Sequence, residues 1–466
     1  MLYLHNPNLN FASSVFPLTC AVQNYAWGKF GLESTVARLV VGDDPLAVIE
    51  DNKPYAELWM GAHPKGDAQI KDNRIAQTTL GQWIAHYPAC LGSKVKDAFQ
   101  GQLPFLFKVL SVNTALSIQA HPNKELAASL HAQFPEHYPD NNHKPEMAIA
   151  LTRFQGLCGF RPVVEILSFL QRESWCCVLC QVFRQLEQYV LLYINFYHLL
   201  YLCCVPEVPE FYALVGQEAA EELQSSMGDE IRSSQALKKC FTRMMSCEKK
   251  VFVDELNELV KRVSEEGAAG KDTSNSNGEL LLRLHSQYPG DIGCFSIYFL
   301  NYVVLEPGQA MFLGANEPHA YIHGDCIECM ACSDNTVRAG LTRKYIDVNT
   351  LCEMLNYKPA SASSKIFPGV PDPSDPYVTL YDSPVPDFKV IKIQVPPSVK
   401  DYCVAAVDSA SILLVIEGDA IAASAAAFSD LTMKRGSVLF VSANESLSLH
   451  ITSQSGVTLF RACCLL

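Results

Sequence analysis

A glutamine, a histidine and a glutamate lie close together between residues 116 and 162, and they could hold a divalent metal ion. Gln119 and His121 are two residues apart, and Glu146 opens an apolar run. Side chains alternate faces along a strand, so Ser117, Gln119 and His121 would point the same way in an extended segment. Amide, imidazole and carboxylate groups suit zinc. A lone histidine and glutamate are more often an ordinary hydrogen-bonded pair, so this pattern leaves both interpretations open.

The surrounding sequence predicts the strands that would position these groups. Residues 104–111 form an apolar run typical of a buried strand, whereas residues 124–131 have helical spacing. Residues 207–285 change to a helical composition. Strand-like patterns return at 294–305 and again from about residue 380 to the end. We therefore expect a mainly β chain with a helical insert.

The bulk composition limits the function classes. The chain has 466 residues, of which 49% are hydrophobic, and its net charge is −13. An acidic chain of this length can build several domains but lacks the basic surface of a general nucleic-acid binder. A local group of lysines and arginines could still bind a small anion. The N-terminus has no secretory signal pattern, and the 18 cysteines suggest free thiols in a cytoplasmic protein.

One segment, residues 172–206, differs sharply in composition from both flanks. It holds five cysteines and a dense run of aromatic and aliphatic residues. The run from Tyr189 to Cys204 is short for a membrane span and contains Asn195 and His198. We therefore interpret the segment as an atypical insertion, from a retained intron or a wrongly assigned exon, and not as a membrane helix.

Four short blocks follow one another in the chain: QAHPNK from Gln119, HKPEM from His143, EPHAY from Glu317, and DCIECMACSDNTVRAGLT from Asp325. In this order they closely resemble the type I phosphomannose isomerases. The resemblance extends over nearly the whole chain. Residues 172–206 have no counterpart in the family pattern, and Arg343 stands where proline is usual.

The resemblance implies two cupin-like (jelly-roll) β-barrels plus a helical domain. Residues 1–162 would form the first part of the catalytic cupin-like domain, and residues 163–290 the helical domain with the insertion. Residues 291–352 would complete the catalytic domain. Residues 353–466 would form a C-terminal cupin-like barrel without a metal.

The resemblance also implies one zinc ion per chain, with four protein ligands: Gln119, His121, Glu146 and His319. We expect the first two from one strand face, Glu146 from the adjacent strand and His319 from a distant strand of the same barrel. Such a site leaves room for water, as catalytic zinc sites do. His63 and His143 match no ligand position and stay as pocket or structural candidates.

The family interconverts mannose 6-phosphate and fructose 6-phosphate through an enediol, a step that feeds GDP-mannose synthesis. This chemistry needs a base, an electrophile and a phosphate anchor. The resemblance marks Arg338 as an active-site residue, and its planar fork suits an anionic sugar. Ser117, Lys144 and Arg338 are the candidate phosphate contacts. The candidate catalytic residues are Arg338, Lys144, Glu328, Asp334 and Lys344, although each charged group alone is more often a solvated side chain.

The expected partner is a small sugar phosphate, and we expect a cytoplasmic monomer without nucleic-acid or membrane partners. The spacing Cys326-x2-Cys329-x2-Cys332 resembles a metal motif, but it lacks a fourth ligand and lies in an apolar run. Two other functions remain open. The 172–206 insertion could expose apolar surface and give an impaired or misfolded variant of the same enzyme. A cupin that only binds a sugar, or performs oxygen chemistry, is the third hypothesis.

Overall fold

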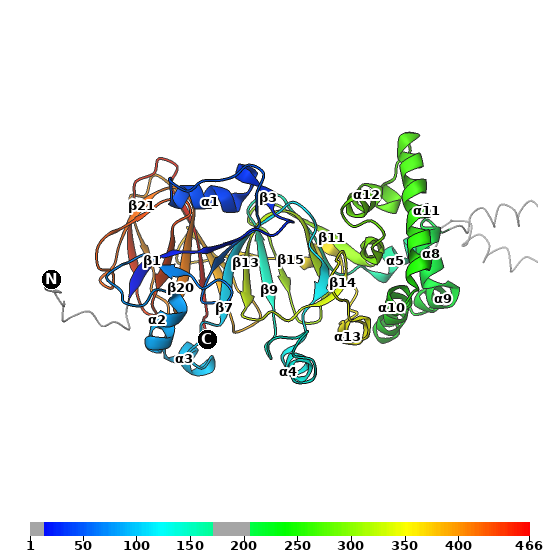
Figure 1. Ribbon diagram of the computed structural model, residues 1–466, viewed down its shortest axis with the longest axis horizontal. Helices are drawn as coiled ribbons and strands as arrows, with labels where there is room; N and C mark the ends of the chain where they lie inside the picture. Colours follow the sequence, from blue (N-terminus) through cyan, green and yellow to red (C-terminus); the bar gives the residue numbers. More distant parts are fainter. Residues whose placement is uncertain (1–13, 171–205) are drawn as a thin grey trace, which may run out of the picture.

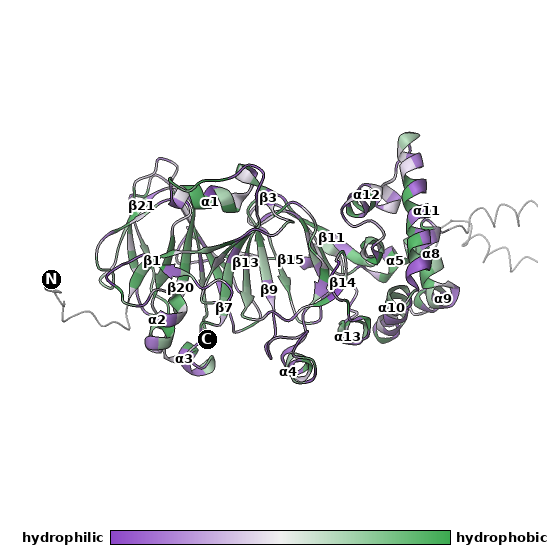
Figure 2. Cartoon of the chain, viewed as in Figure 1, coloured by the Kyte–Doolittle hydropathy of each residue, from purple (hydrophilic) through white to green (hydrophobic). Residues whose placement is uncertain are grey.

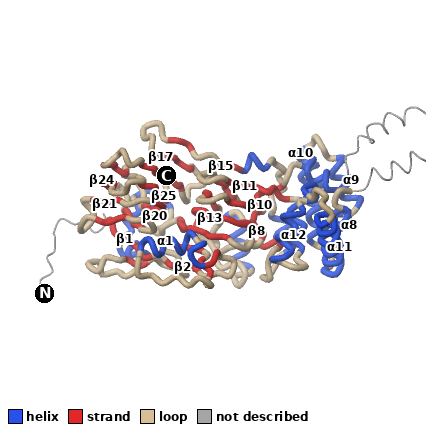
Figure 3. The backbone as a smooth tube through the Cα atoms, turned by 90° about the horizontal axis from the view of Figure 1, so that it is seen from above, coloured by secondary structure: helices blue, strands red, loops and turns tan. Residues whose placement is uncertain are grey.

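The computed structural model describes residues 14–170 and 206–466. Strands fill one end and the middle of the molecule, and helices gather at the other end (Figures 1 and 3). The prediction of a mainly β chain with a helical insert is confirmed. The expected insertion at 172–206 falls, apart from its last residue, outside the described residues, as does the apolar run 189–204. No helix in the described ranges is long and apolar enough to cross a membrane.

An eleven-stranded sheet curls around the candidate metal ligands. Its strands are β2 (Ala21–Gln23), β5 (Glu57–Met60), β7 (Phe105–Val112), β8 (Ile118–Ala120), β9 (Glu146–Ala150), β10 (Phe154–Phe160), β11 (Leu300–Leu305), β12 (Ala310–Leu313), β13 (His319–Ala331), β14 (Val337–Gly340) and β15 (Ile366–Phe367). The long strand β13 joins the rest, because its first part pairs with β8 and β10 and its second part with β7 and β9. The buried strand predicted at 104–111 is β7.

A second β region follows in the C-terminal third. Its eight-stranded sheet has the order β16-β17-β18-β25-β20-β23-β1-β6, and a four-stranded sheet has the order β19-β24-β21-β22. The strands are β16 (Val370–Pro371), β17 (Val378–Tyr381), β18 (Lys389–Val395), β19 (Asp401–Val404), β20 (Ser411–Glu417), β21 (Ala420–Ala423), β22 (Leu431–Met433), β23 (Val438–Val441), β24 (Leu447–Ile451), β25 (Val457–Cys463), β1 (Val15–Thr19) and β6 (Gln69–Ile70).

The start of the chain closes this second region, since Val15 of β1 pairs with Val441 of β23. We propose domain boundaries near residues 162, 290 and 352, with β1 and β6 contributed to the C-terminal sheet. The N-terminal part of the chain also forms the short pair β3 (Lys29–Phe30) and β4 (Pro54–Tyr55), and the helices α1 (Thr35–Asp43), α2 (Leu80–His86) and α3 (Ser93–Ala98).

Six helices form the helical region within the described residues. They are α5 (Val163–Leu170), α8 (Pro209–Val215), α9 (Gln217–Ser225), α10 (Glu230–Met245), α11 (Lys249–Ala268) and α12 (Gly278–Gln287). Hydrophobic and hydrophilic residues alternate along α11 (Figure 2), where Leu256, Leu259 and Val263 are buried at helical spacing. These side chains join a core that reaches Phe160 at the end of β10. The helical region is therefore packed against the eleven-stranded sheet.

The prediction of a single strand at 294–305 is wrong for the first half of this range. Residues Ile292–Tyr298 form a buried 3-10 helix, η4, and only Leu300–Leu305 is extended. The Asp291 side chain accepts a hydrogen bond from the Gly293 backbone and so caps the turn. The predicted helix at 124–131 is confirmed as α4 (Lys124–Gln133), which Asn123 caps. A last helix, α13 (Val348–Met354), lies between β14 and β15.

Candidate metal centre

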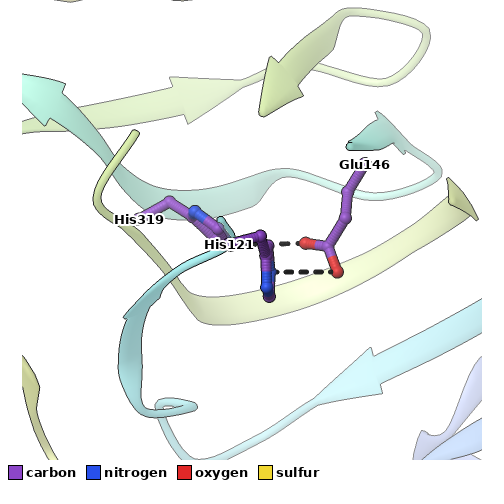
Figure 4. A group of neighbouring side chains, drawn as sticks. All are labelled: His121, Glu146 and His319. Atoms are coloured by element: carbon purple, nitrogen blue, oxygen red, sulfur yellow. Dashed lines mark ion pairs between the residues drawn. The ribbon is translucent and has the colours of Figure 1, made fainter. Parts of the chain in front are cut away.

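Three of the predicted ligands converge inside the eleven-stranded sheet (Figure 4). His121 follows β8 directly, Glu146 opens β9 and His319 opens β13. Nε2 of His121 lies 3.4 Å from one Glu146 oxygen, and Nε2 of His319 lies 3.3 Å from the other. All three side chains are at most 2% exposed. Among the described residues, this is the one group of histidine, cysteine and acidic side chains arranged to hold a metal ion.

Hydrogen bonds on the far side of each ring aim the imidazoles at the centre. Nδ1 of His121 donates to the Asn335 carbonyl at 2.7 Å, and Nδ1 of His319 donates to the Glu317 carbonyl at 2.9 Å. On each ring, Nε2 is therefore the nitrogen whose lone pair is free to bind a metal. Both Nε2 atoms and Oε2 of Glu146 are buried and have no hydrogen-bond partner among the described residues. Buried polar atoms without partners are rare, and three that face one another fit a site that binds a cation.

The spacing of these atoms fits zinc. Zinc bonds to imidazole and carboxylate are about 2.0–2.1 Å long, so two ligand atoms of a tetrahedral ion lie about 3.3 Å apart. The imidazole nitrogens lie at similar separations, 3.4 and 3.3 Å, from the two Glu146 oxygens, and the ligand atoms of the three side chains all lie within 4.8 Å of one another. The three side chains are therefore close enough together to bind one zinc ion.

The protonation states also suit a metal. Burial lowers the pKa of His121 to about 4, which keeps the ring neutral. Burial opposes ionisation of Glu146, but the interactions with His121, Lys144 and His319 outweigh it and hold the Glu146 pKa well below its usual range. Metal ions bind neutral imidazoles and ionised carboxylates, so neither His121 nor Glu146 needs to lose a proton near neutral pH.

The strand register places Gln119 on the face that carries the histidines. Gln119 of β8 pairs directly with His319 of β13 on one side and with Arg338 of β14 on the other. Residues directly opposite in an antiparallel pair point to the same face, so these three side chains form a row. His121 and Ser117, two residues away from Gln119 in either direction, flank this row. The predicted amide ligand therefore faces the metal centre.

The predicted strand arrangement is wrong in one respect. We expected Glu146 on the neighbour of the Gln119 strand and His319 on a distant strand. Strand β13, which carries His319, lies between them, and it pairs with β8 and with β9. The reason is the length of β13, whose 13 residues reach both strands.

Arg338 and Lys344 form a positively charged group, in which Arg338 lies opposite Gln119 in the sheet. Burial lowers the pKa of Arg338, and the guanidinium has no hydrogen bond or ion pair with any described residue. Partial burial lowers the pKa of Lys344, and the charges of Arg338 and Lys65 lower it further. Lysines and an arginine that repel one another become more stable when an anion binds between them. Lys144 lies closer to the metal centre, with Nζ 3.3 Å from Glu146 Oε1.

Glu328 belongs to a buried network next to the metal centre. One of its oxygens accepts from the Tyr321 hydroxyl at 2.8 Å, and the other accepts from Lys108 Nζ at 2.9 Å. Burial raises the pKa of Glu328, although the Lys108 charge opposes the rise. Glu328 pairs with Ala148, so it lies diagonally across from Glu146, about 7–8 Å away, on the same face.

Three residues of this network were not among the predicted site residues: Lys108, its second partner Glu57 at 3.6 Å, and Tyr321. Lys108 is 6% exposed and lies in the middle of β7. A single lysine inside an otherwise apolar run was the available signal, because lysine is almost never buried without a partner.

Other predicted residues lie outside the metal cluster. Asp334 forms ion pairs with Lys65 at 2.7 Å and with His63 at 3.7 Å. His143 Nε2 lies 3.1 Å from both carboxylate oxygens of Asp387. Neither Asp334 nor His143 contacts a described metal ligand through a hydrogen bond or an ion pair. Cys326, Cys329 and Cys332 are free thiols in or directly after β13, and burial raises the pKa of each.

Three family models match this chain. They describe type I phosphomannose isomerase and cover its catalytic domain (residues 15–163), its helical insertion domain (214–300) and its C-terminal part (379–425). Residues 164–213, which include the composition-shifted segment, lie between the first two matches.

Named relatives align with this chain over nearly its full length. Mannose-6-phosphate isomerases from Bos taurus and Homo sapiens are 58% and 57% identical, covering 98% of this chain and 100% of each relative. Mannose-6-phosphate isomerase 2 from Arabidopsis thaliana is 41% identical, over 96% of this chain and 92% of that protein.

Solved structures share the fold. A zinc-bound mannose 6-phosphate isomerase has a TM-score of 0.73 at 28% identity, and a mutant phosphomannose isomerase from Salmonella typhimurium has a TM-score of 0.74 at 27% identity. Each match covers 97% of this chain and 100% of the other chain. The predicted cupin-type fold is confirmed by these neighbours, and the chain belongs to the type I phosphomannose isomerase family.

Proposed function

We propose that this chain is a zinc-dependent isomerase that interconverts mannose 6-phosphate and fructose 6-phosphate. The observation that carries the proposal is the set of buried, unpartnered atoms of His121, Glu146 and His319, spaced for zinc, beside the unpaired guanidinium of Arg338. A metal centre next to an unpaired cation suits a substrate that carries both sugar oxygens and a phosphate.

Four residues hold the zinc ion in this proposal: His121, Glu146 and His319, with Gln119 from the same sheet face. The bound ion supplies a Lewis acid that polarises a sugar oxygen and stabilises negative charge on it. The carbonyl oxygens of Asn335 and Glu317 fix the two imidazole rings, so the ligands need little reordering when the metal binds.

The phosphate or the enediolate binds at the positively charged group of Arg338 and Lys344. Arg338 offers a planar fork of donors with no competing partner, and Lys344 adds charge beside it. Ser117 lies two residues before Gln119 on the same face, and it supplies a hydroxyl contact. Lys144, beside Glu146, binds a sugar oxygen or the phosphate and offsets the charge of the ligand carboxylate.

Proton transfer at the carbon beside the carbonyl is assigned to Glu328. A buried carboxylate with a raised pKa exchanges protons more readily near neutral pH than an exposed one. Tyr321 and Lys108 hold its two oxygens and fix its direction. Asp334 is a weaker candidate for proton transfer, because its carboxylate forms ion pairs with Lys65 and His63.

We place the protein in the cytoplasm as a monomer, where its product would feed GDP-mannose synthesis. The 13 cysteines in the described ranges are all free thiols, and most are buried. Reduced, buried thiols are typical of a reducing compartment.

A coupled assay tests the proposed reaction. Purified protein should form fructose 6-phosphate from mannose 6-phosphate, lose this activity with a chelator and regain it with zinc. Activity that is unchanged by the chelator would contradict the proposed role of the metal. An inactive full chain, with an active variant that lacks residues 172–206, would support the impaired-variant hypothesis; the full-length match to the relatives gives that hypothesis no support.

A further inference from the structure

We infer that Asp291 is a positioning residue for the proposed reaction, because its carboxylate fixes the turn that aims Arg338 and Lys344. The inference rests on the proposed function. Asp291 lies between α12 and η4, at the end of the helical region, and is half-buried. It touches none of the zinc ligands through a hydrogen bond or an ion pair among the described residues.

The Asp291 carboxylate accepts three backbone hydrogen bonds. Oδ1 accepts from Gly293 at 2.7 Å and from Leu341 at 2.8 Å, and Oδ2 accepts from Thr342 at 3.0 Å. The contact with Gly293 is local and only caps η4. The contacts with Leu341 and Thr342 join segments 50 and 51 residues apart. A structural cap would need the first contact alone, so the other two require a separate explanation.

The turn that Asp291 holds follows the strand of Arg338. Strand β14 contains an irregularity between Arg338 and Gly340, where the register with β8 shifts. Such a bulge turns the following chain and redirects side chains. Leu341 then adopts a positive φ of 51°, which is strained for a side chain of this kind. The hydrogen bonds that the Leu341 and Thr342 amides donate to the Asp291 carboxylate hold the chain in this conformation.

Close packing makes the junction sensitive to small changes. A Cβ atom added to Gly340 would lie 2.5 Å from the Gly293 Cα atom. The two glycines therefore let the strand of Arg338 and the start of η4 approach each other. The same approach brings the Asp291 carboxylate within reach of the turn.

The Arg338 side chain has no partner of its own among the described residues, so its position depends on its backbone. Strand pairing with Gln119 fixes that backbone directly, and the Asp291 contacts fix the chain three and four residues further along, at Leu341 and Thr342. Lys344 follows closely, since its amide donates to the Thr342 hydroxyl at 3.0 Å. A displacement of about 1 Å in a substrate-positioning group can lower a rate by about a hundredfold.

The test combines Asp291→Asn with Arg338→Ala. The asparagine keeps the size of the side chain and one carbonyl acceptor, but its amide would oppose the Thr342 N–H. We expect kcat/KM to fall by about 10- to 100-fold and mannose 6-phosphate to bind more weakly in calorimetry, with the zinc content unchanged at one per chain. In the Arg338→Ala background, Asp291→Asn should cost less than about threefold in kcat/KM, because Arg338 is gone and only the exposed Lys344 is left for Asp291 to position.

Two further variants separate positioning from general stability. Gly340→Ala disturbs the same turn from the other side, and it should weaken substrate binding and lose its effect in the Arg338→Ala background. Asp229→Asn, which changes the cap of α10, is the matched control and should keep wild-type kcat/KM.

The inference is wrong if Asp291→Asn retains wild-type kcat/KM, or if its effect multiplies fully with that of Arg338→Ala. A wild-type protein that binds mannose 6-phosphate without converting it would contradict the proposed function only, because the binding measurements would still test Asp291. A wild-type protein that neither binds nor converts the sugar phosphate would contradict both.

Discussion

Replacing Lys108 by methionine should convert a buried network of one lysine and two carboxylates into a pair of buried carboxylates without a positive partner. Methionine matches the length of lysine but carries no charge. Lys108 Nζ lies 2.9 Å from Glu328 and 3.6 Å from Glu57, and all three side chains are less than 10% exposed. Removing one partner of a buried ion pair costs about 3–5 kcal/mol. This loss lowers the folding equilibrium constant by between roughly a hundredfold and several thousandfold.

The pH dependence of this loss follows from the Glu328 pKa. Burial already raises that pKa, and Lys108 is the charge that opposes the rise. Without Lys108, the Glu328 pKa in the folded state rises further above its value in the unfolded chain. A group with a raised folded pKa stabilises the protein at low pH and loses this contribution as pH increases. Lys108→Met should therefore be less stable at pH 8 than at pH 5.5, relative to wild type.

Urea unfolding at the two pH values measures this difference. Lys238→Met is the matched control, because Lys238 forms an exposed ion pair with Glu353, of a kind that contributes about 0–1 kcal/mol. The catalytic prediction follows from the same protonation. A Glu328 that stays protonated cannot accept a proton, so kcat near pH 7 should fall by about 10²- to 10⁴-fold and the acidic limb of the rate profile should move to higher pH. A variant with equal stability loss at both pH values and an unshifted profile would refute the reasoning.

Three other perturbations have defined outcomes. Glu146→Gln removes the one negative ligand, and metal analysis should show loss of bound zinc together with a drop in kcat of at least about a hundredfold. Arg338→Lys keeps the positive charge but loses the planar fork of donors, so steady-state kinetics should give a kcat/KM between those of wild type and Arg338→Ala. Equal kcat/KM values for the lysine and alanine variants would contradict a role for positive charge at this position. Chelation should lower the melting temperature in calorimetry, and zinc at 100 times its Kd should restore about 2.7 kcal/mol of stability; an unchanged melting temperature would argue against a preformed site.

The candidate metal ligands could be named from the sequence because each lies in a short block that resembles the family pattern. Gln119 lies on β8, His121 follows this strand directly, and His319 lies in a block of its own. The structure brings His121, Glu146 and His319 together as expected. The same local signals could not show which strands are neighbours. A strand pattern gives the faces of a strand but not its pairing, so the position of β13 between β8 and β9 was missed.

Groups whose role depends on distant contacts were also missed. Lys108 lies in a run that is otherwise apolar, and no periodicity shows that its partners are on β5 and β13. Asp291 resembles an ordinary turn residue, because its contacts with Leu341 and Thr342 lie 50 and 51 residues further along the chain. The predicted strand at 294–298 fails for a related reason, since the Asp291 cap and tight burial bend an apolar run into η4.

The most direct test of the central claim is a zinc titration of the chelated protein, with fructose 6-phosphate formation as the readout. If His121, Glu146 and His319 hold the ion that the reaction needs, activity should return in proportion to added zinc and stop increasing at one ion per chain. The His319→Ala variant should regain no activity at the same zinc concentrations. Full recovery of activity in His319→Ala, or activity in the chelated wild type before zinc is added, would contradict the account.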